Sequence, residues 1–257
     1  GRCEREVIEV AIRSLGLNDL SIFDADQAII EWRMDSDGPL VERTNRGFSD
    51  LLASDAPAPG GGSVAALCGG LSVALSAMVA QLSTKISAKT WPYATPRPES
   101  WQSFDTLAMR AQQLREAFLH DIDADTAAFD AMMAARKLPK NSDAEKKVRF
   151  NAVRAALIQA IETPLGVLRR TQAAVDCAEL AMTGNPNARS DAGVAVSTAR
   201  ACAEGAWMNV QINLQGMRDQ QLRQQYCAEA DDLLNSIHLR CDNLWKKLSA
   251  ELHSEKA

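Results

Sequence analysis

Metal-binding motifs and sets of reactive side chains are scarce in this sequence. The 3 histidines, His120, His238 and His253, do not have the spacing of metal ligands. The 6 cysteines form no CxxC pair, which argues against a zinc site or a disulfide framework and predicts reduced thiols, as in a cytoplasmic protein. From the histidine and cysteine spacings we expect no bound metal. No Ser/His/Asp set for nucleophilic catalysis is recognisable either.

An excess of positive charge is also absent. The formal net charge is -5 and the isoelectric point is near 5.3, and the adjacent basic residues Arg169-Arg170 and Lys246-Lys247 form only pairs. This composition argues against a general nucleic-acid-binding protein. The first 15 residues are charged and amphipathic rather than apolar, so they do not resemble a secretory signal.

Charged residues are missing from one long segment, which lies between Asp55 and Lys85. An uncharged run of this length raises the question of a membrane-spanning helix. Ala, Gly and Ser dominate the segment, Gln81 lies inside it, and neither a belt of Trp and Tyr nor a basic cluster marks its start. We therefore expect a helix that is buried in protein, and no membrane partner.

The same segment begins with a Gly-rich turn. Pro57 and Pro59 predict an extended entry, Gly60 to Gly62 permit a sharp turn, and a long helix is expected to start near Val64. Gly62 or Ser63 can serve as its N-cap. Small residues then recur along one helix face at positions 62, 66, 70, 74 and 77. The pattern predicts either a tightly packed central helix or, through the free N–H groups of the turn, a cradle for an anion such as a substrate carboxylate.

Helical periodicity extends along the whole chain. We find no convincing alternation of apolar and polar residues, so the predicted fold class is all-α, a bundle of long helices. The expected helices cover residues 1–15, 24–34, 39–53, 64–90, 99–137, 142–183 with a kink at Pro164, 190–214 and 219–252. Ser142 and Ser190 are the expected N-caps of two of them. A polar linker at 35–38 ends a first segment, residues 1–38, and a helical domain follows at 39–257.

One acidic residue interrupts an apolar stripe on the helix at 99–137. The stripe consists of Leu107, Ala111, Leu114, Phe118, Ile122, Phe129 and Met132, spaced by threes and fours. Asp125 completes it, whereas Asp123 and Asp130 project elsewhere and Asp121 lies at its margin. A buried carboxylate is either paired with a basic neighbour or kept for chemistry, and desolvation raises its pKa. Asp125 is therefore a candidate general acid/base, and the alternative is a solvated acidic face with an ion pair.

Amide side chains form two further candidate groups. The loop at 184–191 leads into a helix, and its Asn185 and Asn187 offer donors and acceptors suited to the edge of a heterocycle. The alternative is a capped turn without further function. Asn209 and Asn213 lie one turn apart on an otherwise apolar helix, where they serve a ligand or bond to a neighbouring helix.

Taken together, four stretches of the sequence resemble a known family. APGGGSVAAL (58–67), DADTAAF followed by ARKLPK (123–140), GNPNARSDAGVA (184–195) and NVQINL (209–214) resemble the cyclodeaminase domain of formimidoyltransferase-cyclodeaminase and its relative, methenyltetrahydrofolate cyclohydrolase. The match covers roughly Val41 to Leu252 in the same motif order. The start, SLGLNDLSIFDADQAIIEW, resembles the tail of the transferase domain, so we expect the C-terminal part of a fused protein or a descendant of one.

The resemblance implies a helical, intertwined homodimer that converts 5-formimidoyltetrahydrofolate to 5,10-methenyltetrahydrofolate and ammonia without a metal or cofactor. This lyase reaction belongs to folate and one-carbon metabolism, in cytoplasmic histidine degradation. The family's catalytic aspartate, a proton donor and acceptor, falls on Asp125, with Asp123 the alternative. The expected substrate-binding residues are Gly61, Gly62, Ser63, Asp123, Asn185, Asn187, Asp191, Asn209 and Asn213.

Two other functions fit the same residues. A cyclohydrolase adds water to methenyltetrahydrofolate and releases no ammonia. A non-catalytic helical module only drives oligomerisation, and its support is the small-residue helix face together with departures from the family pattern at Ser76, where Gly is usual, and from Ser83 to Trp101. The transferase-like start favours the cyclodeaminase, because a transferase makes its substrate.

Overall fold

The computed structural model describes residues 10–17, 19, 23, 28, 39–90 and 99–254. The chain divides into two compact units, Gly1–Gly60 and Gly61–Ala257. Most of the predicted helices at 1–15 and 24–34, the linker at 35–38 and part of the atypical stretch from Ser83 to Trp101 lie outside the described residues. The predicted domain boundary between residues 38 and 39 stays a prediction.

In the first unit, helix α4 (Asn45–Leu52) is shorter than the helix predicted at 39–53. Leu40–Glu42 form a separate 3-10 turn, η1. Thr44 follows in an extended conformation, and its hydroxyl accepts a hydrogen bond from the N–H of Gly47 at 3.0 Å. The predicted start at residue 39 is wrong because this Thr cap begins a new helix.

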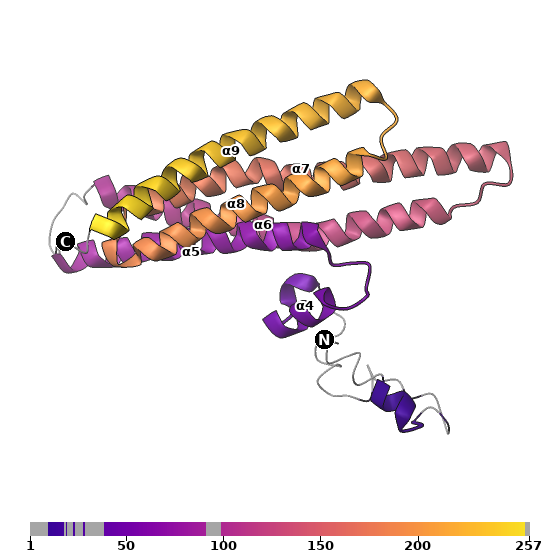
Figure 1. Ribbon diagram of the computed structural model, residues 1–257, viewed down its shortest axis with the longest axis horizontal. Coiled ribbons are helices and arrows are strands. Elements are labelled where there is room, and N and C mark those ends of the chain that lie inside the picture. Colours follow the sequence, from indigo (N-terminus) through magenta and orange to yellow (C-terminus); the bar gives the residue numbers. More distant parts are fainter. Residues whose placement is uncertain are drawn as a thin grey trace. The chain divides into compact units, whose positions relative to one another are not determined.

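The second unit is a bundle of long helices (Figure 1). They are α5 (Gly61–Thr90), α6 (Glu99–Lys137), α7 (Asp143–Ala181), α8 (Arg189–Leu214) and α9 (Gln220–Ser254), with a short 3-10 turn, η2 (Pro186–Ala188), before α8. Helix α5 packs against α6, α7 and α8, and the α6–α7 hairpin extends beyond the start of α5. No strand occurs in the ranges that the structure describes, and the all-α fold class is confirmed.

Helix α5 is the tightly packed central helix that its small residues predict. Positions 62, 66, 70 and 77 are buried and position 74 is half-buried. A Cβ on Gly69 would lie 2.5 Å from the ring of Phe118 in α6, so glycine is needed for this approach. On the α8 side, the Ser72 hydroxyl donates to the carbonyl oxygen of Ala195 at 2.7 Å.

Helix α5 is also long and apolar enough to cross a membrane. Within Gly61–Thr84, an 18-residue window has a mean hydropathy of 1.9, but 61% of this window is buried inside the protein. The buried hydroxyls of Ser76 and Ser83 donate to carbonyl oxygens one turn earlier in the same helix. Burial by neighbouring helices is the arrangement expected for a core helix.

The caps of the later helices match the sequence in part. Helix α7 begins with a capping box, in which the Ser142 hydroxyl accepts from the N–H of Glu145 at 3.2 Å and the Glu145 carboxylate accepts from the N–H of Ser142 at 2.9 Å. The predicted cap at Ser190 is wrong. Helix α8 already begins at Arg189 because η2 leads the chain directly into it, and its N-cap Ala188 makes no side-chain bond.

The apolar stripe of α6 changes direction near Asp125. Up to Ile122 the predicted stripe is buried, apart from the half-buried Leu114. Phe129 is 36% exposed, contrary to the prediction, and Ala128 is buried instead. Beyond the start of α5, α6 buries Met132 against α7, so its buried face turns away from the position of Phe129.

Candidate functional site

Asp125 of α6 lies against the first turn of α5. This helix starts at Gly61, three residues before the predicted start at Val64, so Ser63 belongs to its first turn. The backbone N–H of Ser63 donates to Oδ2 of Asp125 at 3.0 Å. The Ser63 hydroxyl donates to the carbonyl oxygen of Ile122 at 2.9 Å and lies 3.4 Å from the same Oδ2. Backbone and side chain of Ser63 therefore both fix the start of α5 to α6.

Gly62 allows this close approach. A Cβ on Gly62 would lie 2.1 Å from Oδ1 and 2.5 Å from Oδ2 of Asp125, distances that no side chain tolerates. Any larger residue must displace the carboxylate or the helix start. The anion held by the Gly-rich turn in this structure is therefore the carboxylate of Asp125.

The environment of Asp125 acts on its protonation in two directions. The side chain is half-buried, and burial raises the pKa of the carboxyl group. The hydrogen bonds from Ser63 lower this pKa because they stabilise the carboxylate, but burial has the largest effect. Oδ1 accepts no hydrogen bond from the described residues. Asp123 is also half-buried, but its side chain leaves the helix about 200° away from that of Asp125.

The two amides of α8 have different surroundings. Asn209 lies beside the start of α5, where its Nδ2 is 3.4 Å from the place of a Cβ on Gly61. The same Nδ2 donates to the carbonyl oxygen of Gly205 at 2.8 Å. Asn213, one turn further, donates to the carbonyl oxygen of Ala160 in α7 at 2.7 Å. Asn213 thus bonds to a neighbouring helix, whereas Asn209 lies near the Asp125 site.

The polar loop at 184–191 lies elsewhere in the same chain. The N–H of Asn185 donates to the Ser83 hydroxyl at 2.8 Å, and Oδ1 of Asn185 accepts from the N–H of Asn187 at 2.9 Å. Ser83 follows Ser63 by 20 residues along α5, which corresponds to roughly 30 Å. Asp191 lies in the first turn of α8, at this end of the bundle. Within one chain, the predicted site residues therefore lie at two places, around Ser63 and around Ser83.

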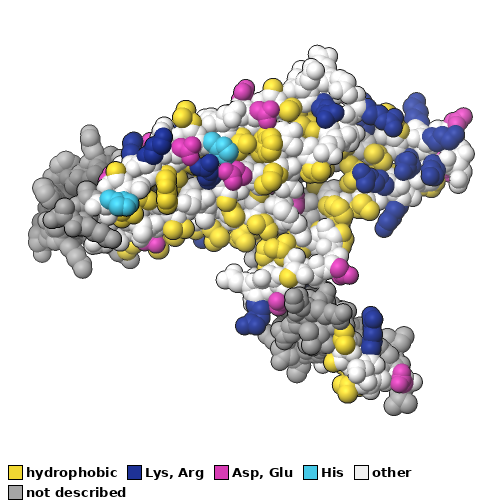
Figure 2. All heavy atoms as spheres, in the orientation of Figure 1, with side chains coloured by type: hydrophobic (Ala, Val, Ile, Leu, Met, Phe, Trp, Pro, Cys, Tyr) yellow, Lys and Arg dark blue, Asp and Glu magenta, His cyan; other side chains and the backbone are white. Residues whose placement is uncertain are grey.

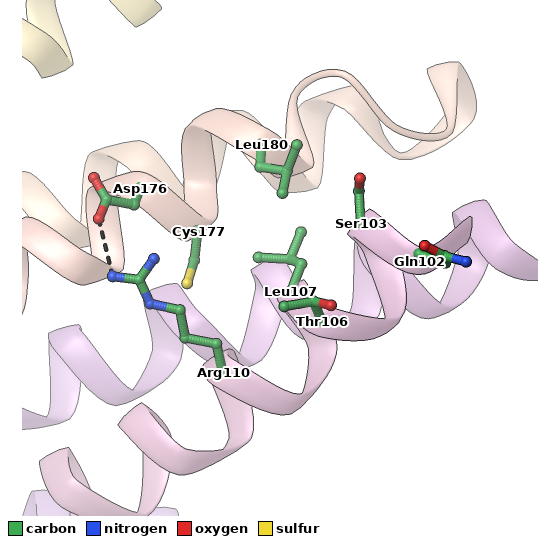
Figure 3. A pocket seen from close by; sticks show the side chains of 8 residues that line it. All are labelled: Gln102, Ser103, Thr106, Leu107, Arg110, Asp176, Cys177 and Leu180. Atoms are coloured by element: carbon green, nitrogen blue, oxygen red, sulfur yellow. Dashed lines mark hydrogen bonds and ion pairs between the residues drawn. The ribbon is translucent and has the colours of Figure 1, made fainter. Parts of the chain in front are cut away.

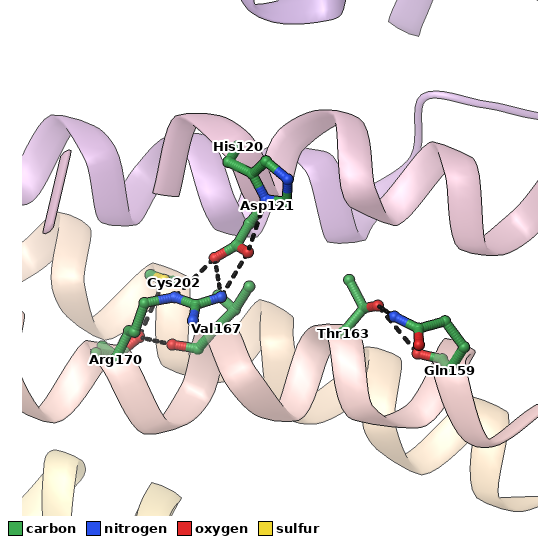
Figure 4. Close-up of polar contacts among 8 residues, drawn as sticks. His120, Asp121, Gln159, Thr163, Val167, Arg170 and Cys202 are labelled. Atoms are coloured by element: carbon green, nitrogen blue, oxygen red, sulfur yellow. Dashed lines mark hydrogen bonds and ion pairs between the residues drawn. The ribbon is translucent and has the colours of Figure 1, made fainter. Parts of the chain in front are cut away.

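Asp121, which the sequence places at the margin of the apolar stripe, is the most deeply buried carboxylate among the described residues of α6. Asp121 is 5% exposed and forms an ion pair with Arg170 of α7, whose Nε donates to Oδ2 at 2.9 Å (Figure 4). Burial raises the pKa of Asp121, and the charges of Arg170 and His120 oppose this shift. Its spacing of four residues from Asp125 was the available signal, because such positions share a helix face.

A separate cavity of about 520 Å³ lies between α6 and α7 (Figure 3). Arg110 and Asp176 form an ion pair of 3.0 Å at its side, and the Cys177 thiol also lines it. Burial raises the pKa of Cys177 to about 11, so this thiol is protonated at neutral pH. Arg110 precedes Asp125 by 15 residues on α6, or roughly 22 Å, so within one chain the cavity is separate from the Asp125 site.

The described residues offer no metal site. In the parts of the chain with a described structure, no group of three or more His, Cys, Asp or Glu side chains could hold a metal ion. Cys202 is buried against Thr171, with 3.2 Å between sulfur and hydroxyl oxygen, and burial raises its pKa to about 12. It acts as a small apolar residue of the core.

Several known proteins are similar to this chain. A family model described as formiminotransferase-cyclodeaminase matches residues 44–232. The chain is 38% identical over 207 residues to the methenyltetrahydrofolate cyclohydrolase of Methylorubrum extorquens. The aligned region covers 80% of this chain and 96% of that protein. It is 34% identical over 227 residues to the formimidoyltransferase-cyclodeaminase of Mus musculus, covering 84% of this chain but 39% of the mouse protein.

A solved structure has the same arrangement of helices. The formiminotetrahydrofolate cyclodeaminase of Thermotoga maritima superposes with a TM-score of 0.66 at 23% identity, over 84% of this chain and 98% of that chain. This likeness shows the fold. The family match itself includes Ser63, Asp125 and Asn209. The chain therefore belongs to the formiminotransferase-cyclodeaminase family.

Proposed function

We propose that this chain is a formimidoyltetrahydrofolate cyclodeaminase, which forms 5,10-methenyltetrahydrofolate and ammonia from 5-formimidoyltetrahydrofolate. The observation that supports this most directly is the Asp125 carboxyl group. It is half-buried, its pKa is raised by burial, and Oδ2 is held by the N–H of Ser63 while Oδ1 accepts no hydrogen bond from the described residues. A carboxyl group whose pKa is raised in this way is suited to act as both general base and general acid.

The reaction needs two proton transfers. N10 of the folate attacks the carbon of the protonated amidine (amidinium) on N5, a C–N bond forms, and N10 loses its proton to Oδ1 of Asp125. The tetrahedral intermediate then breaks its bond to the outer nitrogen, which takes the proton from Asp125 and leaves as ammonia. The carboxyl group ends as it began, and no electrons are exchanged with a cofactor. Holding N10 against the amidine carbon supplies a large proximity effect.

Asn209 and the turn from Gly61 to Ser63 are the substrate contacts on the Asp125 side. The Asn209 amide lies beside the start of α5, and Gly61 leaves the backbone open there. The space beside Gly62 is filled by the Asp125 carboxylate, so the role of Gly62 is to position this carboxylate. Asn213 is engaged with α7, and Asp123 lies on another side of α6, so their assignment to the substrate has less support.

A homodimer would bring the polar loop to the Asp125 site. Residue 73 lies midway between Ser63 and Ser83 on α5, so a twofold axis near it places the Ser63 end of one copy opposite the Ser83 end of the other. Exposed apolar side chains flank this point, since Leu71 is 49% and Met78 is 38% exposed. Helix α8 exposes a similar stripe at Val194, Met208 and Ile212. Apolar stripes of this kind are typical of subunit interfaces.

The cyclohydrolase is the second candidate function. Its support is the relative from Methylorubrum extorquens, which bears that name and matches this chain over 96% of its length. In this reaction water attacks the methenyl carbon, a C–O bond forms, and the ring opens at one C–N bond. Asp125 would take one proton from water and return it to the departing nitrogen, and the second proton of the water would pass to solvent as the formyl C=O bond forms. The same carboxyl group serves both reactions, so geometry does not separate them.

Product analysis separates the candidates. Purified chain is mixed with 5-formimidoyltetrahydrofolate, and ammonia release and methenyltetrahydrofolate absorbance are followed together. Both rise in step if the cyclodeaminase proposal is correct. If neither rises, methenyltetrahydrofolate is supplied, and its loss identifies a cyclohydrolase. A folded chain that acts on neither compound is the non-catalytic oligomerisation module.

The cellular context follows from the same proposal. A cyclodeaminase would act in one-carbon metabolism, in cytoplasmic histidine degradation, and next to a formimidoyltransferase that supplies its substrate. The mouse relative carries both activities in its name, and this chain spans 39% of its length. A fused or associated transferase is therefore part of the proposal, and copurification with transferase activity from the source organism tests it.

A further inference from the structure

The fold gathers at one end of the bundle basic side chains that the sequence shows as dispersed. Residues 136–154 and 216–223 together contain 9 Lys and Arg but 3 Asp and Glu, although the whole chain has a net charge of -5. Figure 2 shows Lys and Arg side chains gathered over the end formed by the α6–α7 hairpin. A strongly basic end on an acidic protein indicates an anionic ligand.

A groove of about 1000 Å³ lies in this basic end, between the α6–α7 hairpin and the α8–α9 turn. Its basic lining residues are Arg136, Lys140, Lys146, Arg149, Arg154 and Arg218. One acidic residue, Asp219, also lines it. Apolar side chains complete the lining, among them Leu157 and Phe150, of which Phe150 is 58% exposed. Both the volume and the mixture of apolar and charged groups are those of a small-molecule site.

Two of the six basic side chains already have structural partners. Nε and Nη2 of Arg149 donate to the carbonyl oxygen of Arg136 at 3.2 Å, and these hydrogen bonds satisfy a backbone carbonyl group in the last turn of α6. Lys146 pairs with Asp143 at 2.9 Å. The other four side chains make no hydrogen bond or ion pair with the part of the chain that the structure describes: Arg136, Lys140, Arg154 and Arg218. Their charges are thus available to a ligand.

We infer that this groove binds a small polyanion with a flat apolar body. Arg154 and Arg218 provide planar, bidentate donors that suit phosphate or carboxylate oxygens. The exposed ring of Phe150 provides a surface for stacking. Nucleoside polyphosphates and folates with several carboxylates share this chemistry, and the experiment below distinguishes these two sources.

The groove is distinct from the Asp125 site. Arg136 follows Asp125 by 11 residues on α6, a distance of about 16 Å along the helix, and Asp125 does not line the groove. A ligand bound there does not need the proton chemistry of Asp125. Binding of ATP by an Asp125→Asn variant should therefore equal that of the unmodified chain, whether or not the proposed reaction occurs.

Calorimetric titration with ATP and with folic acid tests the site. The double variant Arg154→Gln/Arg218→Gln removes two unpaired cations from the groove. The control Lys246→Gln/Lys247→Gln removes the same charge from α9, outside the groove. We expect the groove variant to bind at least about tenfold more weakly, because it loses charge-assisted hydrogen bonds, and the control to change by less than about twofold.

The outcomes separate clearly. Binding of ATP that folic acid does not displace assigns the groove to nucleoside polyphosphates, and displacement or preferred binding of folic acid assigns it to folates. Either result supports the site if the groove variant loses binding and circular dichroism shows that it is folded. No binding of either probe overturns the inference. Equal losses in the two double variants also overturn it, since they show attraction by net charge alone.

Discussion

The backbone N–H of Ser63 donates to Oδ2 of Asp125 at 3.0 Å, across 62 positions of the sequence. The donor is a backbone group, so it remains when the Ser63 side chain is changed. The Ser63 hydroxyl has its shorter bond, of 2.9 Å, to the carbonyl oxygen of Ile122. The orientation of the Asp125 carboxylate is therefore set by the two helices that carry these residues.

Replacement of Asp125 by Asn should stop turnover without unfolding the chain. The amide oxygen can still accept the N–H of Ser63, but the group cannot take up and return a proton. We expect the rate to fall by about 10²- to 10⁴-fold, the usual contribution of a general acid/base. Ammonia release at saturating substrate measures it, and Asp130→Asn, an exposed change on the same helix, is the control. Full turnover by folded Asp125→Asn would remove Asp125 from the mechanism.

Gly62→Ala should impair activity through the position of Asp125. The added methyl group would lie 2.1 Å from Oδ1, so the carboxylate or the first turn of α5 must shift. Gly70→Ala is the matched control on α5, because its nearest contact is an ordinary 3.7 Å to Phe118. We expect about 10²-fold loss of turnover for Gly62→Ala, as for a misplaced catalytic group, and little change for Gly70→Ala. Similar rates for both variants would show that the close approach at Gly62 has no role.

The raised pKa of Asp125 predicts a pH dependence of stability. Because burial raises this pKa in the folded state, the folded chain binds the proton more tightly than the unfolded chain. The stabilisation is present below the pKa of the unfolded chain and is lost as pH rises through the folded pKa. Asp125→Asn has no such loss. The unfolding free energy of Asp125→Asn minus that of the unmodified chain should therefore rise as pH increases from the unfolded-state pKa through the folded-state pKa. Urea titrations at several pH values measure this difference. A difference that stays flat or falls would contradict the raised pKa.

The sequence predicted the helices and Asp125 because both depend on local periodicity. The stripe through Phe118 and Ile122 requires a buried face, and Asp125 occupies a position on it. Periodicity shows which face of a helix is apolar, but it does not show over what length a neighbouring helix covers that face. For this reason Phe129 was expected inside, although it lies beyond the start of α5 and is exposed.

The composition of the site could be predicted only in part. The sequence named Ser63 and Asn209, which lie near Asp125, but it also named Asn185 and Asn187, which lie next to Ser83. Which end of a long helix a motif occupies depends on how the helices pair, and α5 and α8 run in opposite directions. The ion pair of Asp121 was not predicted because its partner, Arg170, is 49 residues away in the sequence.

The Asp121–Arg170 pair should contribute to stability rather than to chemistry. Removal of Arg170 leaves a carboxylate that is 5% exposed without its partner. A fully buried pair costs about 3–5 kcal/mol when one partner is removed, and less is expected here because the Arg170 side chain is 34% exposed. Arg170→Met should therefore lower the urea midpoint of unfolding. The double variant Arg170→Met/Asp121→Asn should recover part of this loss, because it no longer buries an unpaired carboxylate. A double variant less stable than Arg170→Met would show that the charge of Asp121 has another partner.

Mixing of two inactive variants should restore activity if the site is shared between subunits. Asp125→Asn removes the proton shuttle and Asn187→Ala alters the polar loop, which lies roughly 30 Å away within one chain. In a dimer with a twofold axis near residue 73, a mixed pair has one site with both changes and one intact site. Co-refolding of equal amounts gives mixed pairs in half of the dimers, so about a quarter of normal activity should return. Activity that stays at the level of the separate variants would place Asn187 outside the shared site, because no intact site would then form in the mixed pair.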